Sequence, residues 1–380
     1  MKKIIFIFTI ILVASCKSEI ILVPESVSIT LSGGESSLTD SLFLSNRQEV
    51  HLETNGKSII NNISKIIEID DSLLYVFDKS LNQIVVFNYS GKFIQLINHT
   101  GHGHGEYVHL LDVTYDNKNQ ELLCLVDPTS IMHYDKGGNY LRKESVRGHY
   151  TDISVDSNYI YLYNSTFANG KAPNYTVDCI EKESGEYRSL LKFNHEYAPF
   201  CSIGNKMFQG AGGIYFVRKF DSNIYQITDG EIKKIWDLDI RSFEIPKSEL
   251  DKQYKCDEIF TYCDDNKLIF LYKDVVVGRN YILFSSNLND LNIINKDKKT
   301  YRKYSYMNVS DYNIPVSSYV LIEGANNKCA FIVFSSSVVN FHEQRSQNEF
   351  FKKIVNPTFF DLTENITINS NPILYIYSLK

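Results

Sequence analysis

The residues best suited to bind a ligand lie in one glycine-rich stretch, His99–His109, with the sequence HTGHGHGEYVH. It holds four of the nine histidines beside a glutamate, and imidazole and carboxylate groups are good ligands for zinc, copper or nickel. Flexible glycines between the ligands do not preorganise a metal site, and no second carboxylate or cysteine lies nearby. Three interpretations therefore stay open: a structural turn, a metal site, or a ligand contact.

We favour the structural turn. The glycines permit a tight turn with positive φ, and Glu106 and Tyr107 are expected to hold it in place. His102, His104, Glu106 and Tyr107 remain the candidate ligand-binding residues, without an assigned metal. The sequence contains no nucleophile elbow, HExxH helix, phosphate-binding loop or dinucleotide fingerprint, so no catalytic residue is assigned.

Four short apolar runs precede this stretch and must position it. They are Ile66–Ile69, Leu73–Phe77, Ile84–Phe87 and Phe93–Ile97, and four strands joined by tight turns are typical of one β-propeller blade. The abundance of Tyr (26) and Phe (23) suits such half-buried pleated surfaces.

Looser copies of this unit follow along the chain, and such repetition indicates radially repeated units. The sequence thus predicts an all-β fold, a six-bladed β-propeller with four-stranded antiparallel blades. The later copies begin near Leu110, Asp152, Gly212, Thr261 and Ser318, and insertions are expected at Ser165–Asn174, Ile245–Asp257 and Ser335–Asn356.

Two acidic pairs, Asp70-Asp71 and Asp264-Asp265, fall where turns are expected before a strand. Aspartates favour such turns because their side chains bond to the nearby backbone. Calcium is the alternative, because it prefers hard oxygen ligands, and it is the one cofactor considered for the chain.

The N-terminus has the pattern of an export signal. Lys2 and Lys3 precede an apolar run, Ile4–Val13, that is too short to span a bilayer comfortably, and Val13-Ala14-Ser15-Cys16 resembles a bacterial lipobox. We expect a signal peptide over residues 1–15, lipid attachment at Cys16, a tether with the first strand material over 16–47, and the propeller over 48–380. The protein would then be anchored to a membrane of the cell envelope, the outer membrane, without spanning it.

Composition limits the choice of partners. A formal charge of −6 without long basic runs excludes the clustered positive footprint that nucleic-acid binding needs, and we expect a monomer. Six cysteines remain beyond Cys16, of which only Cys256 and Cys263 are close enough in sequence to suggest a local disulfide.

The chain resembles the six-bladed β-propeller lipoproteins of gut Bacteroidetes, which are related in architecture to NHL-repeat and TolB-like propellers. The matching segments are EVHLETNGKSIINNISKIIEIDD, LLYVFD, VVFNYSGKFIQLI, GHGHGEY and NPILYIYSLK, together with the lipobox. The resemblance implies fold and location. Members usually carry a basic residue at the position of His102 and proline at that of His104, while they keep the glycine spacing, Glu106 and Tyr107, which argues against a metal site.

Two functions stay open. We favour a membrane-anchored, non-catalytic binding or scaffolding propeller that presents its loop face to a protein, peptide or glycan ligand. The alternative is a hydrolase or lactonase-like enzyme that uses a divalent cation in the central channel, which would require acidic or polar side chains from several blades to converge. The last strand, Ile373–Leu379, is expected to pair with Val27–Leu31 or Val50–Thr54 and so join the two ends of the chain.

Overall fold

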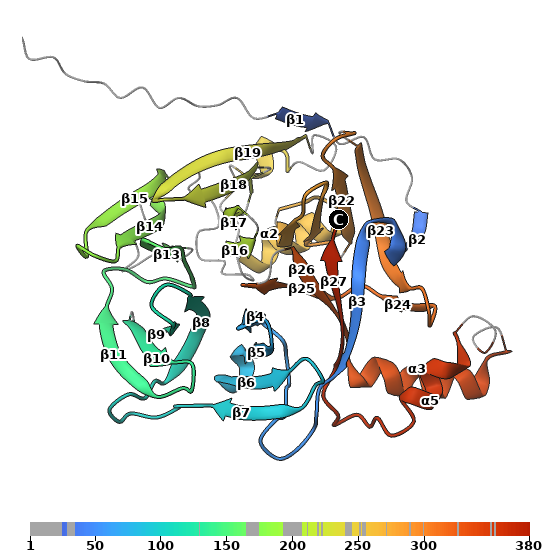
Figure 1. The fold of residues 1–380 in the computed structure, drawn as a ribbon. Coiled ribbons are helices and arrows are strands. Elements are labelled where there is room, and N and C mark those ends of the chain that lie inside the picture. Colours follow the sequence, from blue (N-terminus) through green and yellow to red (C-terminus); the bar gives the residue numbers. More distant parts are fainter. Residues whose placement is uncertain are drawn as a thin grey trace, which may run out of the picture.

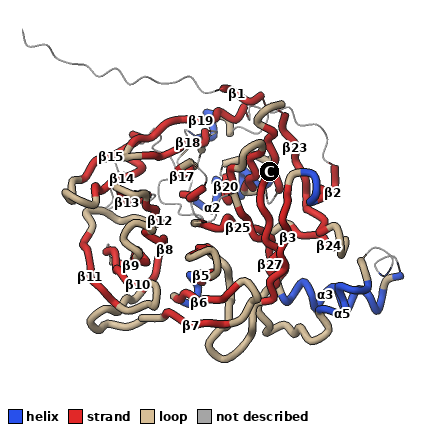
Figure 2. Tube along the Cα trace, viewed as in Figure 1, coloured by secondary structure: helices blue, strands red, loops and turns tan. Residues whose placement is uncertain are grey.

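The computed structural model describes most of the chain from residue 25 onward, and strands joined by turns and loops are its main secondary structure (Figure 1; Figure 2). The described strands form five hydrogen-bonded sheets, in which four-stranded antiparallel units recur. The described residues are 25–28, 35–239 and 245–380, except 129, 165–174, 193–206, 211, 219, 222, 251, 253–255, 271, 289, 299, 325–326, 350–351 and 353–354.

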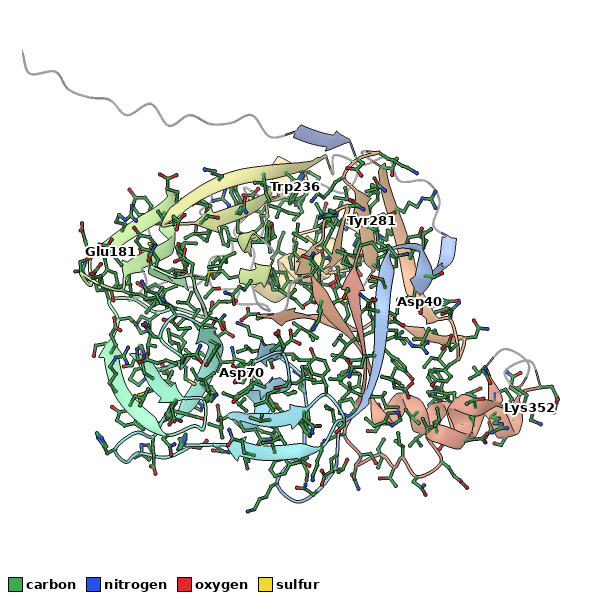
Figure 3. The ribbon with its side chains drawn as sticks, viewed as in Figure 1. Asp40, Asp70, Glu181, Trp236, Tyr281 and Lys352 are labelled. Atoms are coloured by element: carbon green, nitrogen blue, oxygen red, sulfur yellow. The ribbon has the colours of Figure 1, made fainter. Side chains whose placement is uncertain are left out.

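The first unit has the four strands that the sequence predicts. They are β4 (Lys65–Ile69), β5 (Leu73–Asp78), β6 (Gln83–Asn88) and β7 (Phe93–Ile97), hydrogen-bonded in that order. Every residue of β4 and nearly every residue of β5 and β6 is buried, because neighbouring sheets cover both faces. Asp70, labelled in Figure 3, and Asp71 have positive φ values of 55° and 52°, so this acidic pair forms the predicted turn.

The next two units also keep the predicted order of four strands. The second consists of β8 (His109–Asp116), β9 (Glu121–Asp127), β10 (Ser130–Asp135) and β11 (Tyr140–Ser145). The third consists of β12 (Asp152–Val155), β13 (Tyr159–Tyr163), β14 (Tyr175–Glu181) and β15 (Tyr187–Lys192).

The fourth and fifth units differ from the prediction at their first strands. Unit four starts upstream of Gly212, with β16 (Met207–Gly210), followed by β17 (Gly213–Phe216), β18 (Asn223–Thr228) and β19 (Glu231–Asp239). Unit five starts only at β20 (Tyr272–Val277) and continues through β21 (Tyr281–Ser286), β22 (Leu291–Asn295) and β23 (Thr300–Val309), with β24 (Ile314–Val316) paired to β23.

A helix replaces the strand expected at Thr261. This helix, α2 (Cys256–Asp265), follows the short α1 (Lys247–Leu250). Ile259 and Cys263, one turn apart, are both buried and pack in one cluster with Phe270, which fixes the helix on its neighbours. Asp264-Asp265 therefore ends a helix and does not form a turn before a strand, so the prediction for this acidic pair is wrong.

The sixth unit joins the two ends of the chain. It contains β25 (Tyr319–Glu323), β26 (Lys328–Val333), β27 (Ile373–Leu379) and, from the N-terminal side, β3 (Leu44–His51). β27 and β3 are antiparallel, with Leu374 opposite Val50, so the predicted pairing with Val50–Thr54 is confirmed at Val50 and His51, whereas the strand extends back to Leu44 and does not reach Thr54. β25 continues the sheet by pairing in parallel with β4.

The N-terminal segment also lies along two other sheets. β1 (Glu25–Ser28) pairs in parallel with β19, and β2 (Glu35–Thr39) pairs in parallel with β23. Val27 therefore pairs with Leu238 of β19, so the first of the two predicted pairings with the last strand is wrong. Three consecutive sheets each receive one strand from the start of the chain.

The first strands of the units lie at the centre and the last strands at the outside. β4, β8, β12, β16, β20 and β25 contact one another in this order, and β25 returns to β4. Figure 1 shows β7, β11, β15 and β19 along the outer rim of this arrangement. Apolar side chains fill the space between neighbouring sheets, so the core is distributed around the centre.

The insertion predicted at Ser335–Asn356 contains one described helix, and a second follows directly after it. They are α3 (Ser335–Gln347) and α5 (Pro357–Leu362), which begins with proline at its first position and an Asn356 side chain that caps the Thr358 N–H at 3.0 Å. They lie at the outer edge beside β3 and β24, away from α2 (Figure 1). The predicted insertion at Ser165–Asn174 lies outside the described residues. Among the described helices, none has the length and apolar character needed to cross a membrane.

Candidate functional site

A buried lysine on the central axis is the most unusual polar feature of the structure. Lys65 begins β4, and its Nζ lies 2.8 Å from Oδ1 of Asp112 on β8 and 3.3 Å from Oε1 of Glu323 on β25. The Lys65 Nζ also donates to the backbone carbonyl of Val113 at 2.9 Å. The side chains of all three charged residues are at most 4% exposed. We call Lys65, Asp112, Asp152 and Glu323 the axial cluster.

The axial cluster joins five of the six inner strands. Oδ2 of Asp112 accepts from the backbone N–H of Ile153 on β12 at 2.9 Å, and the Glu323 carboxylate accepts from the backbone N–H of Gln209 on β16. Asp152, the first residue of β12, is 2% exposed and adds a third carboxylate to the electrostatic environment of Lys65. The axial cluster therefore links inner strands that belong to different units.

Burial and neighbouring charges shift the pKa values of this cluster in opposite directions. Burial alone would lower the pKa of Lys65, but the carboxylates of Asp112 and Glu323 outweigh it and hold the pKa well above its usual value. Burial raises the pKa of Glu323 to about 7, against the opposing effect of Lys65. Burial likewise raises the pKa of Asp112. One ammonium thus faces three carboxyl groups, and burial raises the pKa of both Glu323 and Asp112.

Carboxyl groups from three sheets do converge on the axis, as a cation site in a central channel would require. The ammonium of Lys65, however, lies between Asp112 and Glu323 and is itself the cation that these carboxylates bind. Across the residues that the structure describes, no group of three or more His, Cys, Asp or Glu side chains is arranged to hold a metal ion. Lys65 therefore lies between the carboxylates that a divalent cation on the axis would need as ligands.

Sequence reasoning missed the axial cluster. The available signal was a charged residue inside a strand that is mostly apolar and buried, as in KIIEI for Lys65 and LLDVTYD for Asp112. Charged side chains are almost never fully buried unless they are paired. Each such residue therefore predicts a partner, although the sequence does not say which.

The glycine-rich stretch forms the predicted turn between β7 and β8. The backbone N–H of Tyr107 donates to His99 O, and that of Gly101 donates to Tyr107 O, both at 2.9 Å. Oε2 of Glu106 accepts from the N–H of Gly103 at 2.7 Å. Gly105 has a φ of +77°, and a Cβ there would lie 2.8 Å from Cγ of Tyr140. Both the backbone conformation and the close approach require glycine.

Aromatic side chains fix this turn to the rest of the protein. Tyr107 is 3% exposed, and its hydroxyl donates to Asn82 O at 3.0 Å. His99 stacks on Tyr134 with 4.8 Å between ring centroids, and its Nε2 lies 2.8 Å from Gly138 O. These contacts explain why the sequence keeps aromatic residues beside flexible glycines.

The candidate ligand-binding residues divide into two groups. Glu106 and Tyr107 hold the turn, whereas His102 and His104 are exposed at its surface, and His104 meets Tyr140 edge to face at 4.8 Å. A role of these four residues in ligand binding stays a prediction. Cys16, the predicted site of lipid attachment, lies outside the described residues.

The local disulfide considered for Cys256 and Cys263 does not form. Both residues belong to α2, and Cys263 is a buried free thiol. Seven residues along an α-helix span roughly 10 Å, which exceeds the Cα separation that a disulfide permits. Cys124, Cys179 and Cys329 are also buried and free.

The repeated four-stranded antiparallel sheets, with their first strands at the centre, define a β-propeller-like fold. Residues 27–378 match the family described as a domain of unknown function, DUF4934, and the chain belongs to that family. No curated protein matches the sequence.

Several solved structures are similar to this chain. A putative exported protein of Bacteroides fragilis is 13% identical, with a TM-score of 0.73 over 93% of this chain and 99% of that one. A DUF4221-family protein of Bacteroides vulgatus is 11% identical, with a TM-score of 0.54 over 89% and 97%. Virginiamycin B lyase from Staphylococcus aureus is 15% identical, with a TM-score of 0.43 over 75% and 81%.

Proposed function

We propose that the six four-stranded units form a closed six-bladed β-propeller that serves as a non-catalytic binding or scaffolding module of the cell envelope. The ordered contacts of the inner strands and the pairing of β3 with β27 support closure. In this proposal the propeller presents one end, rich in long loops, to a protein, peptide or glycan partner.

The unequal length of the connections at the two ends carries the proposal. In an antiparallel unit, the connections after the first and third strands share one end, and the others share the opposite end. The connections after the first and third strands are short turns, the longest being the five residues 182–186 between β14 and β15. The connections after the second and fourth strands include residues 52–64, 98–108, 240–271 and 334–372. Because β25 and β4 run in parallel, the long connections of the sixth and first units lie at the same end.

Loops on a rigid scaffold are the usual carriers of recognition, whereas short turns mainly reverse the chain. We call the ends of the propeller the loop end and the turn end. The axial cluster supports recognition at the loop end over chemistry on the axis, because Lys65 already neutralises buried carboxylates there.

Lipid attachment at Cys16 would hold the propeller at the outer membrane as a monomer. The sequence pattern at the N-terminus supports this location, and the Bacteroides fragilis structure with a TM-score of 0.73 is described as a putative exported protein. The proposed partner would then be a molecule of the envelope or of its surroundings.

Photo-crosslinking in intact cells tests the proposal. A photoreactive amino acid is placed at exposed positions of the loop end, Ile59 or Val108, and at exposed positions of the turn end, Lys118 or Ser184. We expect discrete adducts from the loop-end positions only. Adducts from the turn end alone, or equally from both ends, would contradict the proposal.

The alternative, an enzyme with a divalent cation on the axis, has one observation in its favour: Asp112, Asp152 and Glu323 reach the axis from three sheets. Calorimetric titration of the full chain with calcium and with zinc distinguishes the two functions. Stoichiometric binding that disappears in Asp112→Asn would support the enzyme. Unchanged binding in that variant would exclude the axis as the metal site.

A further inference from the structure

We propose that three loops of the first unit together form a docking surface for an acidic peptide segment with aliphatic side chains. The surface comprises residues 55–62, 79–82 and 102–109, and we call it the three-loop surface. This inference rests on the proposed binding function and assigns it a place on the loop end and a chemical class of partner.

Hydrogen bonds fasten the first two loops together. Oδ2 of Asp78 accepts from the backbone N–H groups of Asn61 at 2.6 Å and Asn62 at 3.0 Å, and the Asn61 side chain donates to Ser80 Oγ at 3.0 Å. Nε2 of Gln83 donates to Ile59 O at 2.7 Å. The segment 55–62 therefore lies directly beside the short 3-10 helix Lys79–Leu81.

Asn82 fastens the third loop on the other side. It ends the 3-10 helix in the left-handed conformation, with a φ of 52°. Its Oδ1 accepts from the backbone N–H of Leu110 at 2.9 Å, while its carbonyl accepts from the Tyr107 hydroxyl at 3.0 Å. The three loops thus have a fixed relative position, and preorganised loops lose less conformational entropy when they bind.

Each of the three loops exposes one large aliphatic side chain. Ile59 is 49% exposed, Leu81 39% and Val108 38%, and they are three of the nine large hydrophobic residues exposed in the described part of the chain. Single exposed apolar residues need no explanation. Three of them on loops that are bonded to one another indicate an interaction surface.

The charges around these side chains determine the partner. Lys57, Lys79, His102, His104 and His109 are exposed on the same loops. Glu106 is the one acidic residue within the three segments.

The carboxylate of Glu106 accepts from Gly103, and that of Asp78 is buried and accepts from Asn61 and Asn62. A basic surface on a chain with a net charge of −6 favours an acidic partner, because opposite charges steer association. Tyr107, the one Phe, Tyr or Trp of these loops, is buried, so the large exposed apolar side chains are aliphatic, and a partner with aliphatic side chains fits them.

Three labelled decapeptides test the inference by fluorescence polarisation against the full chain: alternating Leu-Glu, alternating Leu-Lys and alternating Ser-Glu. We expect the Leu-Glu peptide to bind at least tenfold more tightly than the other two. The double variant Leu81→Ser/Val108→Ser and the double variant Lys57→Glu/Lys79→Glu should each weaken that binding at least tenfold. Leu362→Ser/Ile368→Ser, which alters two exposed aliphatic residues elsewhere, is the matched control and should bind like the wild type.

Equal affinity for all three peptides, no binding at millimolar concentration, or equal loss in the control would overturn the inference. So would self-association of the wild type that Leu81→Ser/Val108→Ser abolishes, because the occupant would then be a second copy. Loop-end photo-adducts that persist in Leu81→Ser/Val108→Ser would refute this surface while the proposed function stands. Absence of all loop-end adducts would refute the proposed function itself.

Discussion

Lys65 on β4 and Asp112 on β8 form an ion pair, with Nζ 2.8 Å from Oδ1, although both side chains are almost completely buried. They are 47 positions apart in the chain and belong to different sheets. Glu323, from the unit that also contains the last strand, completes the pair from the other side. Buried ion pairs therefore connect the inner strands at the centre of the molecule, whereas apolar side chains fill the space between neighbouring sheets.

Removing the central ammonium should destabilise the protein strongly. Lys65→Met leaves three buried carboxyl groups without their cation, and the loss of one partner of a buried pair costs about 3–5 kcal/mol. Urea unfolding of the variant should show a loss of this size. The matched control is Lys352→Met, since the Lys352–Glu349 pair is largely exposed and its loss should change stability by less than about 1 kcal/mol. Equal effects of the two substitutions would show that the axial cluster is not structural.

Glu323 should make stability depend on pH. Its pKa is raised from the ordinary value of 4.5 to about 7, so the folded state binds more protons than the unfolded state between these values. Its contribution is therefore complete below pH 4.5 and is lost as the pH rises to about 7, by up to roughly 3 kcal/mol.

The measurement is the difference in unfolding free energy between the wild type and Glu323→Gln at pH 5 and at pH 7.5. Relative to the wild type, Glu323→Gln should gain stability as the pH rises. Glu343→Gln, at an exposed position, controls for the loss of one carboxyl group. A difference that does not change with pH would contradict the assignment.

Glycine should be required at position 105. Gly105→Ala places a side chain at a φ of +77° and brings its Cβ against the ring of Tyr140, so we expect a loss of about 2 kcal/mol. Gly56→Ala is the control, because a Cβ at that position meets nothing within 4 Å. Thermal unfolding of both variants measures the difference, and similar melting temperatures would show that the turn tolerates alanine.

Deletion of Pro372–Lys380 should prevent soluble expression. It removes β27 and leaves both β3 and β26 with unpaired edges, which promote aggregation. Deletion of residues 25–39, which carry β1 and β2, should be tolerated far better, because these strands only extend the outer edges of β19 and β23. The soluble fraction after expression is the measurement, and a well-folded chain without β27 would refute the pairing as the closure of the fold.

The sequence alone predicts the first two units well. Runs such as Leu73–Phe77 and Ile84–Phe87 are buried on both faces and are bounded by turn residues, so their period and limits are clear. β16 was missed because Met207–Gly210 contains only two large apolar residues. The sequence around α2 predicts a strand because Ile259 and Cys263, which define one face of the helix, are followed closely by the apolar run at Leu268.

The axial cluster could not be predicted because its members meet only when the units are arranged around one centre. Lys65, Asp112 and Glu323 come from three units, and no local pattern encodes their distances. The turn at Gly105, in contrast, was predictable, since all its main constraints lie within a few residues.

The pairing of β3 with β27 implies a delay between the synthesis of the two strands. Ile373 lies opposite His51, so β3 is synthesised more than 300 residues before the strand with which it pairs. At 5–20 residues per second, this delay is roughly 15–65 seconds. Throughout it, a newly synthesised chain carries an unpaired strand edge, and β27 is the element that must be made before this sheet is complete.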